Sequence, residues 1–157
     1  MEIYSKDFTL DFALKCIETL RSAYGNKHDV TKKFRSRCRN LIESIYYSGL
    51  TYTLAYIASK GGNVVLENAL QANSPKDIVE YIKSQYSQSE EASYALYGSF
   101  LIALLRQLEA PEIVNAKSFL EILRNLNTST TLPVTEEKAL RFAEWLKRLA
   151  EALFEAE

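Results

Sequence analysis

Positively charged side chains are concentrated between residues 27 and 39 of the sequence. Six of the 19 lysines and arginines lie there against one acid, Asp29; they are Lys27, Lys32, Lys33, Arg35, Arg37 and Arg39. Ammonium and guanidinium groups bind phosphate oxygens, so such a cluster is typical of a nucleic-acid surface. It is equally typical of a solvated helix face, and the spacing of the charges has to decide between the two.

The spacing places these charges on both sides of an apolar helix face. With 100° per residue, one face collects Phe34, Cys38, Leu41, Ile42 and Ile45. Lys32, Arg35 and Arg39 fall at one edge of that face, while Lys33 and Arg37 lie beyond the other. No acid is interleaved between residues 32 and 39 to neutralise the helix. We therefore predict that these five cations bind nucleic acid through phosphates, without sequence preference.

A second group of this kind stands near the end of the sequence. Arg141, Trp145 and Arg148 are spaced by four and three, which puts both guanidinium groups beside the indole ring. Trp145 could be a core residue covered by arginines through cation–π contacts. It could also anchor an interface, because Trp and Arg dominate binding hot spots. The sequence leaves both interpretations open.

The residues that could support catalysis are few. His28 is the only histidine, and it stands in a polar turn without a carboxylate to orient it. The glutamate pairs at 90–91 and 136–137 stand at helix starts, and adjacent helical residues do not face each other. Gly61 and Gly62 follow no strand and lack the GxGxxG spacing of a phosphate loop. We expect no catalytic residue and no cofactor.

The two cysteines, Cys16 and Cys38, show no metal-binding or redox pattern. Neither belongs to a CxxC pair or has a histidine-rich neighbourhood, so a zinc or redox site is not expected. Helical spacing puts both on apolar faces, where they could in principle form a disulfide bridge. We favour two buried thiols in a reducing compartment.

Length and composition indicate one ordinary globular domain over residues 1–157. Apolar residues make up 47% of the chain and charged residues 25%, and the net charge is −1. Nucleic-acid binding would therefore depend on local clustering. No apolar run approaches the roughly 20 residues that a membrane span needs, and residues 1–8 lack the apolar core of a signal peptide. We expect a cytoplasmic protein.

The elements that position these side chains are predicted to be helices only. Apolar residues recur every three or four positions, glycines number 5 and prolines 3, and no segment alternates with period two. The spacing predicts a single-domain all-α bundle of about six to eight helices. They span residues 7–24, 29 or 31 to 48, 50–59, 63–70, 74–86 and 90–108, with two more beginning at 111 and after Thr135. Residues 98–105 are apolar nearly all round, which predicts a central buried helix.

Several details accompany these helices. Phe8 opens a row of inward residues spaced by four, and the helix from Pro111 should bury Phe119, Leu120, Leu123 and Leu126. Segment 84–90 should be a loop or a frayed helix end, and segment 127–134 should be a loop that leads to Thr135 as a helix N-cap. Two ion pairs with favourable i to i+4 spacing, Glu137–Arg141 and Glu144–Arg148, should stabilise the last helix.

Two segments of the sequence resemble a known family. Tyr46–Lys60, YYSGLTYTLAYIASK, is similar to the stretch "nGLlqTLAflxaK", matched by Gly49, Leu50, Thr53, Leu54, Ala55, Tyr56, Ala58 and Lys60. The closing segment KALRFAEWLKRLAEALFE is similar to "A-lxWlkRfA-A-l", matched by Ala139, Leu140, Trp145, Leu146, Lys147, Arg148, Ala150 and Ala152. The two quoted stretches are those of the small helical subunit of type III-B CRISPR effector complexes, the Cmr complexes, and this sequence resembles that family.

This resemblance implies a non-catalytic subunit of an RNA-guided complex. In that family, copies stack head to tail beside the guide RNA held by the backbone subunits, and line the channel where target RNA pairs. RNA cleavage belongs to the backbone subunit, and nuclease or cyclase activity to the large subunit. By matching positions, the resemblance assigns RNA or neighbour contacts to Lys60, Lys147 and Arg148. The alternative is a protein–protein adaptor whose basic run meets an acidic partner, with no nucleic acid.

Overall fold

The computed structural model describes residues 7–157, which form nine α-helices and no strand. The helices are α1 (Phe8–Tyr24), α2 (Asp29–Ser48), α3 (Leu50–Gly61), α4 (Val64–Asn68), α5 (Pro75–Gln85), α6 (Ser89–Gln107), α7 (Pro111–Val114), α8 (Phe119–Thr128) and α9 (Leu132–Leu153). The predicted all-α bundle is confirmed. Two of the helices, α4 and α7, have only five and four residues.

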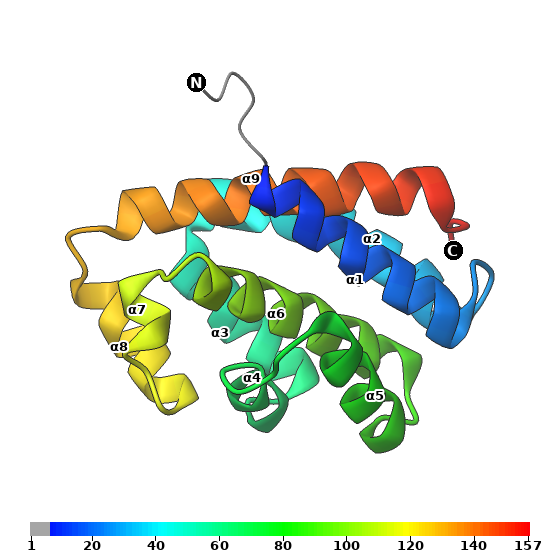
Figure 1. Cartoon of the computed structure of the whole chain (residues 1–157), viewed down its shortest axis with the longest axis horizontal. Coiled ribbons are helices and arrows are strands. Elements are labelled where there is room, and N and C mark those ends of the chain that lie inside the picture. The colour runs from blue at the N-terminus through cyan, green and yellow to red at the C-terminus, as the bar shows by residue number, and fades with distance from the viewer. Residues whose placement is uncertain (1–6) are drawn as a thin grey trace, which may run out of the picture.

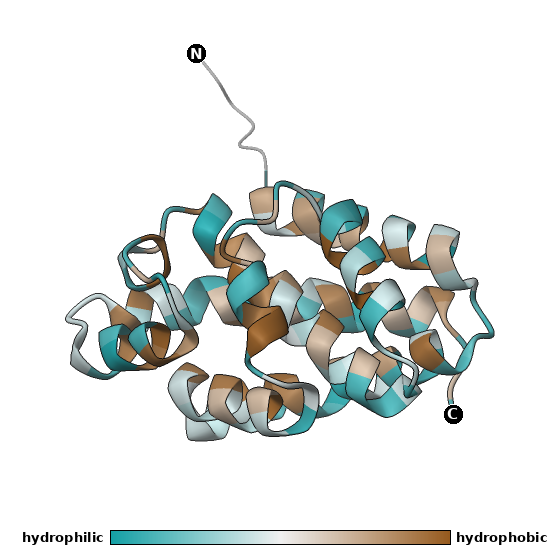
Figure 2. Cartoon of the chain, turned by 90° about the horizontal axis from the view of Figure 1, so that it is seen from below, coloured by the Kyte–Doolittle hydropathy of each residue, from teal (hydrophilic) through white to brown (hydrophobic). Residues whose placement is uncertain are grey.

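The helices are arranged around α6. Helices α1, α2 and α9 pack together on one side, and α3, α4, α5, α7 and α8 lie on the other (Figure 1). Every residue from Ala92 to Leu105 is buried, so the predicted central helix is confirmed. The surrounding helices carry alternating hydrophobic and hydrophilic segments (Figure 2), as helices with one buried face require. Helix α2 contacts α6, α3 and α9, and this placement sets the surroundings of its cations.

One predicted helix is divided in two. The helix that begins at Pro111 ends at Val114, and α8 begins only at Phe119. Ser118 caps α8 by accepting a hydrogen bond from the Glu121 amide at 3.2 Å. The buried face of α8 is formed by Phe119, Ile122 and Leu126. Leu120 lies off this face and is 68% exposed, so the prediction that it is buried was wrong.

The predicted loops are shorter in the structure. Helix α9 begins at Leu132, because Pro133 fits the first helical turn, where its missing N–H loses no hydrogen bond. Thr135 is therefore a buried helical residue and not the N-cap. The connectors shrink to residues 86–88 and 129–131. At the other end of the chain, Phe8 was predicted to point inward, but it is 59% exposed, so this prediction was wrong.

Carboxylates from other helices cap the starts of two helices, α3 and α8. The Leu50 amide of α3 donates to Glu136 of α9 at 2.8 Å, and the Phe119 amide of α8 donates to Glu67 of α4 at 2.8 Å. These acids satisfy amides that have no partner within their own helix, and they complement the helix dipole. Such contacts link the helix ends to one another across the fold.

Both cysteines are buried free thiols, as predicted. Burial raises the pKa of both thiols well above the usual value, because a thiolate would be poorly solvated in the core. Within residues 7–157, no helix is long and apolar enough to cross a membrane.

Candidate nucleic-acid interface

The cations of α2 reach two different neighbours. The Arg37 guanidinium lies 4.3 Å from the centre of the Tyr94 ring of α6 and donates a hydrogen bond to the Tyr94 hydroxyl. Arg39 forms an ion pair with Glu151 of α9 at 3.5 Å. The helix thus carries charge on both sides of its buried face, in agreement with the helical spacing.

The charge of this cluster is partly balanced by acids from the end of the chain. Three of its cations form ion pairs there: Lys27 with Glu155 at 3.7 Å, Lys33 with Glu157 at 3.2 Å, and Arg39 with Glu151 at 3.5 Å. Charges that balance only after folding leave no pattern within α2, which is why the sequence reasoning missed them. Lys32, Arg35 and Arg37 form no ion pair within the part of the chain that the structure describes.

Arg35 differs from the other cations of the cluster. Its Nε atom is buried and has no hydrogen-bond partner among residues 7–157, although the side chain as a whole is only half-buried. A buried donor without an acceptor is unfavourable, so few remain in native proteins. The fold therefore leaves part of the hydrogen-bonding capacity of Arg35 unused.

A row of tyrosines joins Arg37 to Lys60. The Lys60 ammonium lies 5.6 Å from the centre of the Tyr56 ring, and the Tyr56 ring meets the edge of Tyr94 at 6.0 Å. Tyr52, which is 58% exposed, lies nearly parallel to Tyr56 at 6.5 Å. We call Lys33, Arg37, Lys60, Tyr52 and Tyr56 the α2–α3 surface. It combines positive charge with aromatic faces, the chemistry used to hold single-stranded nucleic acid.

The sequence reasoning did not assign these tyrosines a role. Tyr52, Tyr56 and Lys60 are spaced by four along α3, so a search for aromatic residues in helical register with a cation would have found them. Their link to Arg37 depends on Tyr94 of α6, which lies far away in the sequence.

The cluster on α9 is tied to α1. The Trp145 indole donates to Asp7 at 3.2 Å, and Arg141 pairs with the same carboxylate at 3.9 Å. Hydrogen bonds from Thr9 and Trp145 lower the pKa of Asp7. Arg141 therefore pairs with Asp7 in place of the predicted Glu137. Trp145 is half-buried against α1, and its role as an interface anchor stays a prediction.

The opposite side of α9 faces α2. Leu140, Glu144, Lys147 and Glu151 follow one another by four and three residues, and Glu151 reaches Arg39. Arg148 forms the predicted ion pair with Glu144 at 3.0 Å and is exposed. We call Arg39, Lys147 and Arg148 the α2–α9 surface. The nine predicted cations are thus spread over more than one face of the molecule.

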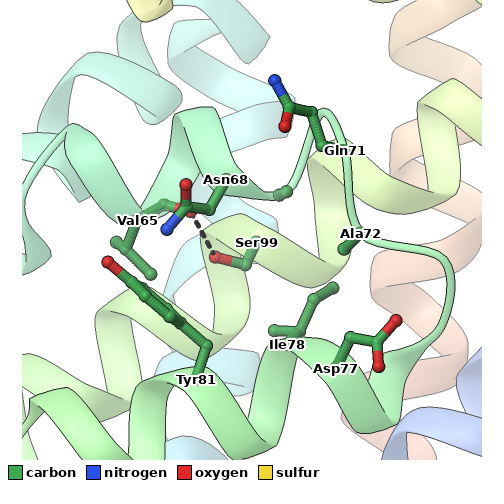
Figure 3. Close-up of a pocket in the computed structure, with 9 residues that line it drawn as sticks. Val65, Asn68, Gln71, Ala72, Asp77, Ile78, Tyr81 and Ser99 are labelled. Carbon is green, nitrogen blue, oxygen red and sulfur yellow. Dashed lines mark hydrogen bonds between the residues drawn. The ribbon is translucent and has the colours of Figure 1, made fainter.

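A cavity of about 380 Å³ lies where α4, α5 and α6 meet (Figure 3). Its lining includes one carboxylate, Asp77, which accepts a hydrogen bond from the Asn73 amide at 3.2 Å. Ser99 donates to the Val65 carbonyl at 3.5 Å across the cavity floor. The lining residues include no histidine and no second acid. Among residues 7–157, no group of three or more His, Cys, Asp or Glu residues is placed to hold a metal ion.

Comparison with known proteins identifies the family. The family described as CRISPR-associated protein (Cas_Cmr5) matches residues 8–153. The CRISPR system CMR subunit Cmr5 of Saccharolobus solfataricus is 34% identical over 160 residues, covering 96% of this chain and 94% of the relative. The chain belongs to the Cmr5 family. The match spans α1 to α9, so the whole Cmr5 fold described above is covered.

Solved structures agree with this membership. A chain in the cryo-EM structure of the type III-B Cmr-beta complex bound to non-cognate target RNA is 27% identical, with a TM-score of 0.69. That match covers 99% of this Cmr5 chain and 100% of the other chain. A chain in the Cmr-beta complex bound to cognate target RNA and AMPPnP is 28% identical over 95% of this chain and 97% of that one, with a TM-score of 0.67. The resemblance inferred from two short segments therefore extends over the fold.

Proposed function

We propose that this Cmr5 protein is the non-catalytic small subunit of a type III-B Cmr effector complex that targets RNA in antiviral defence. The supporting observation is its full-length match to a chain of Cmr-beta complexes bound to target RNA. In this proposal it works in the cytoplasm with the backbone and large subunits, stacks head to tail with copies of itself, and lies along the guide and target RNA duplex. It needs no cofactor.

The proposed RNA contacts are made by cations and go to phosphates. The candidates are Lys32, Lys33, Arg35, Arg37, Arg39, Lys60, Arg141, Lys147 and Arg148, with Trp145 as a candidate contact to a neighbouring subunit. These candidates differ in the partners that they already contact within the protein. Lys60 is exposed and lies against the Tyr56 ring, whereas Arg141 is already paired with Asp7. Contacts to phosphate give affinity that falls with salt and does not depend on sequence.

The test replaces cations on each surface in the reconstituted complex. Lys60→Gln with Lys33→Gln removes two of the three cations of the α2–α3 surface. Lys147→Gln with Arg148→Gln removes two of the three cations of the α2–α9 surface. Each lost phosphate contact should weaken target-RNA binding and reduce the slope of log affinity against log salt by about one. Glutamine is used because it retains part of the side-chain packing that alanine would remove.

Lys76→Gln on α5 is the control for the loss of an exposed charge outside both surfaces, because Lys76 pairs within α5, with Glu80 at 3.9 Å. Unchanged affinity and salt slope for both double variants would contradict the proposed contacts. A complex that forms equally well without RNA, and whose assembly alone is weakened by these variants, would favour the protein–protein adaptor.

A further inference from the structure

The segment that follows α9, residues 154–157, folds back onto the start of α2. Phe154 is buried with its ring 6.4 Å from Phe34, and the Glu155 amide donates to the Asn26 carbonyl at 3.1 Å. Figure 1 shows this end of the chain beside the turn between α1 and α2. An apolar anchor and a backbone hydrogen bond thus direct the segment toward the basic cluster, and Glu157 comes to lie over α2.

The Glu157 carboxylate accepts hydrogen bonds from side chains on one face of α2. One oxygen accepts from the Ser36 hydroxyl at 2.6 Å, and the other accepts from the Lys33 ammonium at 3.2 Å. Arg37, one turn beyond Lys33, adds its positive charge to the same place. The hydrogen bond from Ser36, followed by that from Lys33, lowers the pKa of the Glu157 carboxyl. The bound group is therefore an anion.

Arg37 is held in position before any ligand arrives. Its Nε donates to the Lys33 carbonyl at 3.3 Å, and its guanidinium rests on the Tyr94 ring at 4.3 Å. An ammonium, a hydroxyl and a fixed guanidinium at spacings of three and four residues are the donors that a phosphate group accepts from. The carboxylate of Glu157 is a smaller acceptor-only anion and stands in the place of such a group.

We infer that Lys33, Ser36 and Arg37 form a binding site for a backbone phosphate of RNA, and that Glu157 occupies this site in the free protein. RNA and the segment 154–157 then compete, and binding releases Glu157 while Phe154 stays anchored. This inference rests on the proposed function, because it requires the subunit to contact RNA.

The contact with Glu157 is suited to displacement. The Lys33 and Glu157 side chains remain 31% and 42% exposed, and exposed ion pairs contribute little to stability because water and salt screen them. A phosphate on a strand that also contacts Lys60 gains from several contacts at once. The arrangement therefore favours RNA without requiring a change in the helices.

The test compares two single substitutions that change charge equally. Glu157→Gln removes the competing anion and should tighten binding of a synthetic target RNA to the reconstituted complex about two- to fivefold at low salt, an advantage that shrinks as salt rises. Glu155→Gln is the matched control, because Glu155 pairs with Lys27 and does not contact the three donors. It should change affinity much less.

A second comparison separates site-specific competition from a general charge effect. In a Lys33→Gln, Ser36→Ala background the gain from Glu157→Gln should disappear, because the two groups that donate hydrogen bonds to Glu157 are absent. Equal tightening by Glu155→Gln and Glu157→Gln, or a gain that persists in that background, would overturn the inference.

The outcome also separates this inference from the proposed function. If Lys33→Gln and Lys60→Gln weaken RNA binding while Glu157→Gln matches Glu155→Gln, the subunit binds RNA but Glu157 does not compete. If none of these variants changes RNA affinity, both the inference and the RNA contacts proposed for the α2–α3 surface are wrong.

Discussion

At the scale of single residues, the structure contains a buried acid that pairs with no cation among residues 7–157. Glu112 of α7 is 3% exposed, and three hydroxyls donate to its carboxylate: Ser129 at 2.6 Å, Thr131 at 2.9 Å and Thr135 at 2.8 Å. Burial by itself would raise its pKa, but these hydrogen bonds outweigh burial and hold the pKa below the ordinary value of 4.5. The acid joins α7 to the start of α9.

We predict that Glu112→Gln lowers the free energy of unfolding by about 1–3 kcal/mol at neutral pH, because the hydroxyls lose a charged acceptor. A lowered folded-state pKa stabilises the fold above pH 4.5, and this contribution is lost as pH falls through the folded value. The difference between wild type and variant should therefore shrink below pH 4.5. Urea unfolding at several pH values measures it.

Glu18→Gln, at an exposed position on α1, serves as the control for this substitution. A constant difference between wild type and Glu112→Gln across the acid range would contradict the role given to the ionised carboxylate.

At the scale of elements, the start of α3 depends on a different helix. The chain turns at Gly49, whose φ of +92° favours glycine, and the next amide, Leu50, donates to Glu136 of α9. Local sequence predicts a helix start after this glycine, but it does not show which group caps it. The cap comes from 86 residues away.

We predict that Glu136→Ala destabilises the protein by about 0.5–2 kcal/mol, the usual cost of losing a helix cap. Hydrogen exchange should increase first in the amides at the start of α3. The adjacent Glu137→Ala is the matched control, because Glu137 is exposed and forms no ion pair within the described residues. Equal effects of the two variants would argue against the cap.

At the scale of the whole molecule, a single core joins all nine helices of the described region. Helices α3 and α6 approach each other closely at Gly61, where an added Cβ would lie 2.8 Å from the Ala95 backbone nitrogen. Backbone cannot move aside as a side chain tip can, so the two helices would have to separate. A single core also implies one cooperative unfolding unit.

We predict that Gly61→Ala lowers the free energy of unfolding by about 1–3 kcal/mol through overpacking. Because we propose one domain, fluorescence of Trp145, the only tryptophan, and far-UV circular dichroism should report the same lowered midpoint. Ser59→Ala, at an exposed position of α3, should leave the midpoint almost unchanged. Separate midpoints for the two probes would contradict a single cooperative domain.

Helical periodicity was sufficient for much of this fold. It predicted the all-α class, the buried face of α2 and the complete burial of the centre of α6, because these features depend on the spacing of apolar residues. It failed where single local residues set the helix boundaries. The helix from Pro111 ends at Val114, Ser118 caps a new helix, and Pro133 begins α9 earlier than the threonine at 135 suggested.

For the candidate site, the sequence by itself determined which cations exist and on which helix edges they lie, because helical geometry fixes the direction of each side chain. Only the tertiary structure decided their partners. It brought Glu151 and Glu157 to the cations of α2, placed Arg37 on Tyr94 of α6, and joined Lys60 to the same surface. Those contacts connect residues far apart in the chain, and they arise only when the helices pack.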